Sequence, residues 1–163
     1  MLSKESADIF QDFMPNNICF GCGKSTKDGL HIKSYWNGQY SECVWTPREI
    51  HQGWPNIMNG GIIATIIDCH AMGTSMAYAH KHEQRDLGSL PEYRYATGSI
   101  KVKYIKPTPN RTVTLKAKVL SYSEKKIVIN CEVISSNEVT AVGEVISFRV
   151  FDSSKKKDNF FQP

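Results

Sequence analysis

Hydrophobic and polar residues alternate along four stretches in the second half of the chain. In the first stretch, Ile100, Val102 and Tyr104 fall on one face and two lysines fall on the other. A period of two residues is that of a half-buried β-strand. The pattern therefore predicts four strands, at Ser99–Ile105, Thr112–Leu120, Ile127–Val133 and Val142–Val150.

Two further strands are expected in the first half of the chain, at Leu30–Trp36 and Gln39–Trp45. They flank the dipeptide Asn37-Gly38, which suits a tight hairpin turn because both residues tolerate positive φ. Before them, Lys4–Phe13 has the pattern of a short amphipathic helix. Pro15 would end this helix because proline lacks the backbone N–H.

One long helix is predicted between the two groups of strands. From Gly60 to about His80 the large apolar residues recur mostly at spacings of three and four, which is the period of one face of an α-helix. This apolar stripe consists of Ile62, Ile63, Ile66, Ile67, Met72 and Met76. Loops are expected on both sides of the helix, at Thr46–Met58 and at the polar stretch His80–Tyr93.

The order of these elements indicates the fold class. Two strands, one helix and four strands cannot be arranged as βαβ units, so the sheet should be mostly antiparallel, with the helix covering its apolar face. We therefore expect an α+β protein with a single domain over residues 1–163, an N-terminal extension at 1–16 and a charged, flexible tail at 152–163. The uncovered edges of such a sheet favour a homodimer or a dimer of dimers.

Composition excludes several classes of protein. The hydrophobic fraction of 40% and the charged fraction of 22% are ordinary for a globular chain, and no apolar run approaches the ~18 residues of a membrane span. The net charge of +4 is mild, and no basic stripe indicates nucleic acid binding. The N-terminus does not resemble a signal peptide, and the five cysteines are scattered, so we expect reduced thiols and a cytoplasmic location.

The predicted helix opens on Asn59-Gly60-Gly61. The first N–H groups of a helix have no intrahelical acceptor, and glycines let a ligand approach that backbone without meeting a β-carbon. The helix start is therefore a candidate oxyanion hole. The alternative is that the glycines only allow the loop to turn tightly into the helix.

One carboxylate, Asp68, lies within the apolar helix, seven residues after Gly61. An ionised carboxylate is seldom fully buried without a partner. Asp68 shares a helix face with the glycines, but about 10 Å separates them along the axis, too far for one carbonyl to reach both. In a symmetric dimer the glycine end of one chain can face Asp68 of the other. The alternative is a structural hydrogen bond between Asp68 and a neighbouring strand or the preceding turn.

Cys19-x-x-Cys22 has the spacing of two zinc ligands, but a structural zinc site needs two more, and His31 is the only nearby supplement. We therefore expect small thiols packed in a tight turn, and no metal site. His51, in the loop before the helix, can border a site at the helix start or be a plain loop residue.

Together these segments resemble the hotdog-fold acyl-CoA thioesterases, in particular their PaaI-like and THEM4-like branch. The helix start "NGG" with Asp68 seven residues on resembles the family's His-Gly-Gly…Asp motif. Further similarity lies in "CFGCGKSTKDGLHI" (Cys19–Ile32), "HQGWPNIMNGG" (His51–Gly61) and "TGSIKVKYIKPTP" (Thr97–Pro109). The resemblance spans most of residues 17–150 and implies a hotdog fold that dimerises.

The resemblance also implies residue roles. It assigns the oxyanion donor to the backbone N–H of Gly60, the general base or nucleophile to Asp68, and a supporting hydroxyl to Thr97. The implied substrate is an acyl-CoA or related small thioester, with coenzyme A present only as part of the substrate and no other cofactor. Asn59 stands where the family usually has His, so it can donate a hydrogen bond but cannot titrate near neutral pH.

A second departure lies in the loop before the helix. Gly53 occupies the place where some relatives supply an Asn or Gln, and Gln52 or Asn56 can substitute for it. We expect Gly61, Asn56 and His51 to contact the substrate.

Two other functions remain open from the sequence. Asn59 favours a binding protein that holds an acyl-CoA without hydrolysing it. A hydroxyacyl-thioester dehydratase would instead pair a loop histidine with a helix acid, for which His51 and Asp68 are the candidates.

Overall fold

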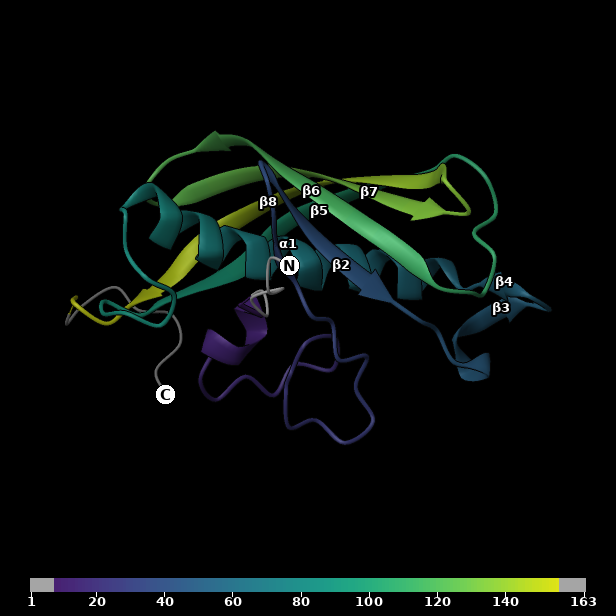
Figure 1. Cartoon of the computed structure of the whole chain (residues 1–163), viewed down its shortest axis with the longest axis horizontal. Helices are drawn as coiled ribbons and strands as arrows, with labels where there is room; N and C mark the ends of the chain where they lie inside the picture. The colour runs from purple at the N-terminus through teal and green to yellow at the C-terminus, as the bar shows by residue number, and fades with distance from the viewer. Residues whose placement is uncertain (1–7, 156–163) are drawn as a thin grey trace, which may run out of the picture.

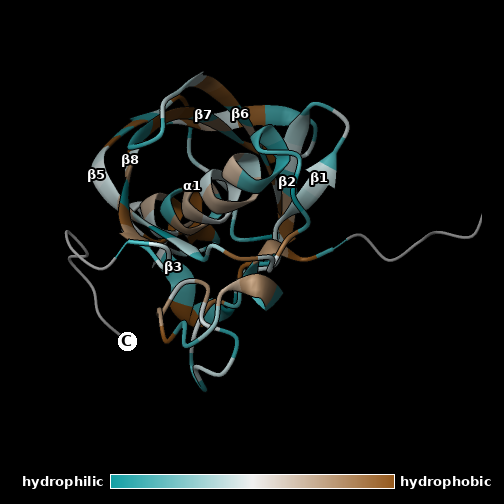
Figure 2. Cartoon of the chain, turned by 90° about the vertical axis from the view of Figure 1, so that its left-hand side faces the viewer, coloured by the Kyte–Doolittle hydropathy of each residue, from teal (hydrophilic) through white to brown (hydrophobic). Residues whose placement is uncertain are grey.

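A curved six-stranded sheet wraps around one long helix (Figures 1 and 2). The computed structural model describes residues 8–155. Every neighbouring pair in the six-stranded sheet is antiparallel, and the spatial order is β1-β2-β6-β7-β8-β5. The strands are β1 Tyr35–Asn37, β2 Tyr40–Trp45, β5 Tyr93–Tyr104, β6 Val113–Tyr122, β7 Lys126–Ser135 and β8 Glu138–Asp152. The predicted α+β class and the antiparallel six-stranded sheet are confirmed.

Helix α1, Gly60–His82, lies against the concave face of the sheet (Figure 2). Its apolar stripe packs on side chains that β6, β7 and β8 point inward, and each fully buried aliphatic side chain contributes about 1.5–3 kcal/mol. The shared core includes Ile63, Ile66, Ile67, Leu115, Ile127, Ile129, Val133 and Val145. Where α1 crosses strand β8, there is no space for a side chain at Gly143, because a Cβ there would lie 2.5 Å from Cγ2 of Ile67.

Strand β5 begins at Tyr93, six residues before the predicted start at Ser99. Its pairing with β8 shifts register between Arg94 and Tyr95 and again between Thr97 and Ser99. Each shift interrupts the strict alternation on which the prediction depended. The opposite error occurs at β1, which keeps only the last residues of the predicted strand, although its turn to β2 lies at Asn37-Gly38 as expected.

The predicted loop Thr46–Met58 contains regular structure that the sequence analysis missed. A 3₁₀ turn at Glu49–His51 is followed by a two-stranded sheet of β3, Gln52–Trp54, and β4, Ile57–Met58. Strands of two or three residues are too short to show a period.

The N-terminal segment covers the side of α1 that the sheet leaves open (Figure 1). Residues 4–7 of the predicted first helix lie outside the described residues, and the described part forms a 3₁₀ helix at Phe10–Phe13 in which Phe10 is fully buried. Strand β8 continues to Asp152, and the tail expected at 152–163 is described only as far as residue 155. Among the described residues, no helix combines the length and the apolar character that crossing a membrane requires.

Candidate active site

Asn59 caps the N-terminus of helix α1. Its backbone is extended and its Oδ1 accepts hydrogen bonds from the N–H groups of Gly61 at 2.8 Å and Ile62 at 3.2 Å. Asparagine is among the best residues for this task. The cap uses the carbonyl oxygen of the side chain, so Nδ2 is the atom that remains to donate toward a ligand.

The Gly60 amide is the N–H at this helix end that the cap does not use. Among the described residues it has no recorded hydrogen-bond acceptor, and Gly60 is only partly buried. The carbonyl of the same residue accepts a hydrogen bond of 2.7 Å from the hydroxyl of Tyr104, on strand β5. The alternating pattern predicts Tyr104 only as part of an apolar strand face and does not reveal this contact.

Asp68 lies on α1 and is only partly buried. The hydroxyl of Thr97, from strand β5, donates a hydrogen bond to its Oδ1. Burial raises the pKa of the Asp68 carboxyl, and the hydrogen bond from Thr97 opposes this rise because it favours the charged form. Among residues 8–155 no ion pair involves Asp68, so its outer oxygen is available to a water molecule or a substrate.

The other predicted site residues lie in and around the β3–β4 turn. Gly61 is exposed at the helix tip. Gln52 accepts the backbone N–H of Asn56 at 2.5 Å through Oε1, so its carbonyl stabilises the turn. Asn56 adopts a positive φ of 64° and is exposed. Gly53 faces the cap residue, since a Cβ built there would lie 3.7 Å from Nδ2 of Asn59.

His51 is buried beneath this turn. Its ring stacks on Trp45 with 5.3 Å between centroids, and its Nδ1 accepts the backbone N–H of Arg48 at 2.9 Å. Its carbonyl accepts the N–H of Asn59 at 2.8 Å. The structure therefore gives His51 a role in holding the cap residue in place, and no hydrogen bond joins its side chain to Asp68 within the described part of the chain.

A cavity of about 470 Å³ lies beside the Asp68–Thr97 pair. It lies between the N-terminal residues Met14–Cys19 and the segment Glu92–Ala96, which enters β5, and Met76 of helix α1 forms part of its wall. Ala96, at one end of the cavity, directly precedes Thr97 on the same strand, whereas Thr97 and Asp68 themselves are not part of the wall. The lining is mainly apolar, as a site for an acyl or aryl group requires.

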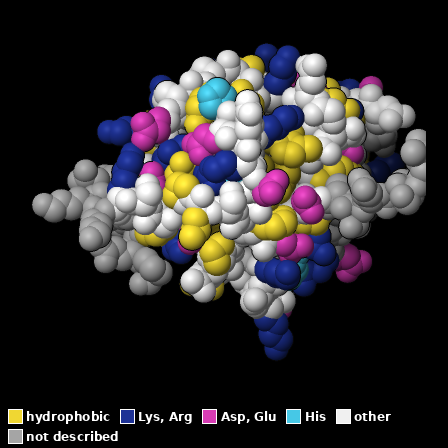
Figure 3. Space-filling view, turned by 60° about the vertical axis from the view of Figure 1, so that its left-hand side comes forward, with side chains coloured by type: hydrophobic (Ala, Val, Ile, Leu, Met, Phe, Trp, Pro, Cys, Tyr) yellow, Lys and Arg dark blue, Asp and Glu magenta, His cyan; other side chains and the backbone are white. Residues whose placement is uncertain are grey.

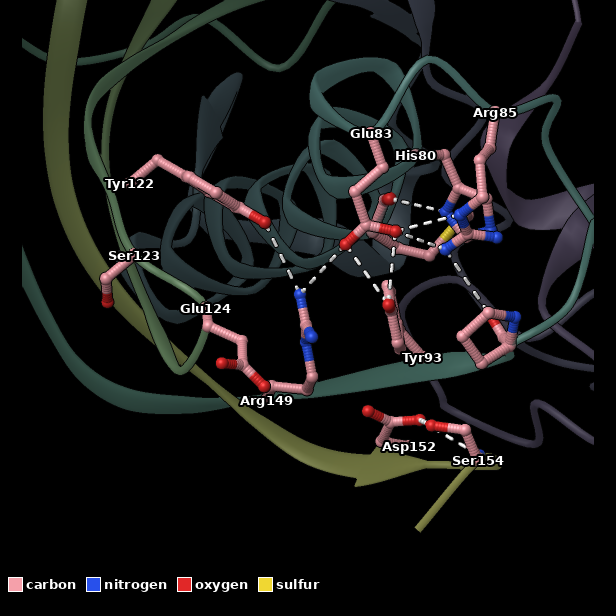
Figure 4. Close-up of polar contacts among 12 residues, drawn as sticks. His80, Glu83, Arg85, Tyr93, Tyr122, Ser123, Glu124, Arg149, Asp152 and Ser154 are labelled. Atoms are coloured by element: carbon pink, nitrogen blue, oxygen red, sulfur yellow. Dashed lines mark hydrogen bonds and ion pairs between the residues drawn. The ribbon is translucent and has the colours of Figure 1, made fainter.

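Two tyrosines of the cavity wall, Tyr93 and Tyr95, are held firmly, and Figure 4 shows the contacts of Tyr93. The hydroxyl of Tyr93 donates to Glu83 at 3.1 Å, and the guanidinium of Arg149 lies 3.7 Å from the centre of the Tyr93 ring. Nε of Arg149 donates to the hydroxyl of Tyr95 at 3.2 Å. Burial raises the pKa of Tyr95 to about 12, so this hydroxyl stays protonated.

The surface near the C-terminal end of α1 carries both charged and apolar side chains. On the face shown in Figure 3, Lys and Arg side chains lie among acidic and hydrophobic ones, and no continuous basic stripe of the kind that binds nucleic acid is visible there.

The comparisons with known proteins identify the family. Residues 55–142 match the family model described as "Thioesterase superfamily". The chain therefore belongs to the thioesterase superfamily. The matched segment contains the capped helix tip, Asp68 and Thr97. The match confirms the thioesterase family that the sequence motifs predict. No curated protein sequence gives a match.

Several solved structures share the fold of this chain. A thioesterase superfamily protein from Shewanella loihica has 27% identity and a TM-score of 0.58, over 71% of this chain and 88% of its own. A thioesterase from Haemophilus influenzae has 12% identity and a TM-score of 0.66, over 83% of this chain and 88% of its own. The Escherichia coli PaaI protein has 13% identity and a TM-score of 0.61, over 76% and 82%. The predicted hotdog fold is confirmed.

Proposed function

We propose that this thioesterase-superfamily protein hydrolyses an acyl-CoA, or a related small thioester, to the free acid and the thiol. The observation that carries the proposal is the Asp68–Thr97 pair, a half-buried carboxylate that is held by one hydroxyl beside an apolar cavity. In the proposal, Asp68 acts as general base or nucleophile and the Gly60 amide is the oxyanion donor. The proposal also assigns the protein to the PaaI-like and THEM4-like branch, which the helix-start motif supports.

The reaction requires two protein groups near the thioester carbon. An N–H group directed at the developing oxyanion contributes about 2.7–4 kcal/mol in other enzymes. In the general-base route Asp68 takes a proton from water, the water oxygen bonds to the carbonyl carbon, the C–S bond breaks and the thiolate takes up the proton. These steps use no cofactor beyond the coenzyme A of the substrate.

The proposal includes a homodimer, or a dimer of dimers. Gly60 and Asp68 of one chain are about 12 Å apart along the helix axis, so one carbonyl cannot contact both. Strand β5 is the free edge of the sheet next to these groups, and a partner strand can pair there. The surface near this edge exposes large apolar side chains that such pairing would cover, namely Ile100, Tyr104 and Phe148.

Hydrolysis of a panel of acyl-CoAs, with the released thiol followed by colour, tests the proposal. We expect turnover by the wild type and a loss of at least about 100-fold in Asp68→Asn, which removes the base and keeps the shape. Asp86→Asn is the matched control, because Asp86 is an exposed carboxylate in the loop that follows α1, and it should keep wild-type activity. Equal activity in the wild type and Asp68→Asn would refute the assignment.

A binding protein for the same ligands is the second candidate. It is favoured by the cap at Asn59, which occupies the side-chain oxygen and provides no imidazole at this position. Saturable binding of acyl-CoA without release of thiol would establish it. The variant Asn59→His then shows whether an imidazole at this position is sufficient for turnover.

A further inference from the structure

Three cysteines from two distant segments meet beside Asp68. The Sγ atoms of Cys19, Cys22 and Cys69 all lie within 4.8 Å of one another, and those of Cys19 and Cys69 are 3.8 Å apart. The sequence predicts no metal site here, because Cys19-x-x-Cys22 lacks further ligands nearby along the chain. Helix α1 supplies the third sulfur, 50 residues further along the chain.

The N-terminal loop is built closely around these sulfur atoms. The backbone N–H of Gly21 donates to Sγ of Cys19 at 3.3 Å, and Nδ2 of Asn17 donates to Sγ of Cys22 at 3.3 Å. Hydrogen bonds from N–H groups favour the thiolate form, which is the form that binds metals. Position 21 also requires glycine for steric reasons, since a Cβ at Gly21 would lie 2.0 Å from Sγ of Cys69.

The sulfur positions fit a tetrahedral ion. With zinc–sulfur bonds of about 2.3 Å, two sulfur ligands of a tetrahedral site lie about 3.8 Å apart. The Cys19–Cys69 separation has this value, and the other sulfur separations exceed it by no more than about 1 Å. Cys22 and Cys69 are buried, whereas Cys19 is exposed, so solvent can reach one side of the cluster.

We propose that Cys19, Cys22 and Cys69 together bind one zinc ion, whose fourth position is open to water or another ligand from the solvent side. The ion would fasten the N-terminal loop to helix α1 next to Asp68. The case for this site does not rest on the proposed hydrolysis. The competing explanation is that the three thiols are only small groups packed in a turn.

Metal titration of the full chain tests this proposal without an activity assay. The protein is prepared without a histidine tag, reduced, and stripped of metal with a chelator. Co²⁺ then serves as the probe, because thiolate ligands give it an intense charge-transfer band in the near ultraviolet. We expect one Co²⁺ per chain, displacement by Zn²⁺, and an increase in the melting temperature when Zn²⁺ is added.

Two variants make the result specific. Cys19→Ser removes an exposed ligand without disturbing the core, and it should weaken Co²⁺ binding at least about tenfold and abolish the thermal shift. Cys43→Ala is the control, because Cys43 is buried in strand β2 outside the cluster, and it should bind as the wild type does. The proposal is overturned if the reduced wild type gives no charge-transfer band, or if both variants lose metal equally.

Discussion

The hydroxyl of Thr97, on the edge strand β5, donates a hydrogen bond to the carboxylate of Asp68, in the middle of helix α1. This contact orients one oxygen of the acid and leaves the other available. It was expected from the family resemblance, and the fold provides it by placing β5 alongside the helix.

Replacing Thr97 with Val should lower kcat about 10- to 150-fold, because a hydrogen bond to a charged group contributes about 1.5–3 kcal/mol. Thr97→Ser keeps the hydroxyl and should retain most of the activity. Steady-state kinetics on the best acyl-CoA of the panel measures both. A Val variant as active as the wild type would show that the contact is structural only.

Two substitutions of the cap residue Asn59 should distinguish its effect on stability from its effect on activity. Asn59→Ala should lower the free energy of unfolding by about 1 kcal/mol, since it removes the acceptor for two helix amides. Asn59→Asp retains that acceptor and loses the Nδ2 donor. Denaturant titration should therefore find Asn59→Asp close to the wild type, and any activity that Asn59→Asp loses is then assigned to the site, through the lost donor and the added negative charge, and not to a loss of folding.

His51 should make stability depend on pH. Burial lowers the pKa of His51, and its Nδ1 already accepts the N–H of Arg48, so the folded protein keeps the ring neutral. The unfolded chain takes up the proton near a pKa of about 6.5. The free energy of unfolding should consequently fall as the pH drops below about 6.5 and level off below the folded-state pKa.

Comparison with His51→Asn between pH 8 and pH 5 isolates this contribution. His70 is fully buried with a pKa lowered to about 4, chiefly by burial, and it adds a slope of the same sign in both proteins. The difference between the two denaturation series should decrease toward low pH. A constant difference would exclude His51 as the source.

The close approach of helix and sheet at Gly143 predicts a steric cost. Gly143→Ala should reduce the free energy of unfolding by about 1–3 kcal/mol, because the new methyl group would overlap Cγ2 of Ile67. In an Ile67→Ala background the same substitution should cost much less. Chemical denaturation of the four proteins of this double-mutant cycle measures the coupling.

Periodic segments of the chain could be predicted, and irregular ones could not. Helix α1 and the strands β6 and β7 follow from spacing, because their large apolar residues recur with the helical or the strand period. The burial of every residue from Cys69 to Ala77, on all sides of the helix, did not follow from that stripe. The register shifts in β5 and the short β3–β4 ladder have no such signature.

The residues of the candidate site could likewise be predicted only in part. Asp68 was evident because it is a charged residue within an apolar helical pattern. Gly60 and Gly61 were evident because two adjacent glycines open that pattern. The cap at Asn59 could have been predicted, since Asn directly before a helical pattern is a common N-cap signal. The meeting of Cys69 with Cys19 could not, because it depends on the path of an irregular loop across the helix.

Strand β5 contacts both ends of the candidate site, through Tyr104 at the Gly60 carbonyl and through Thr97 at Asp68. A shift of this one strand would therefore move the amide and the acid together. Its outer edge has no neighbour in the six-stranded sheet, so whatever occupies that edge would set the geometry of both groups, and catalytic rate would respond to assembly even while the helix stays folded.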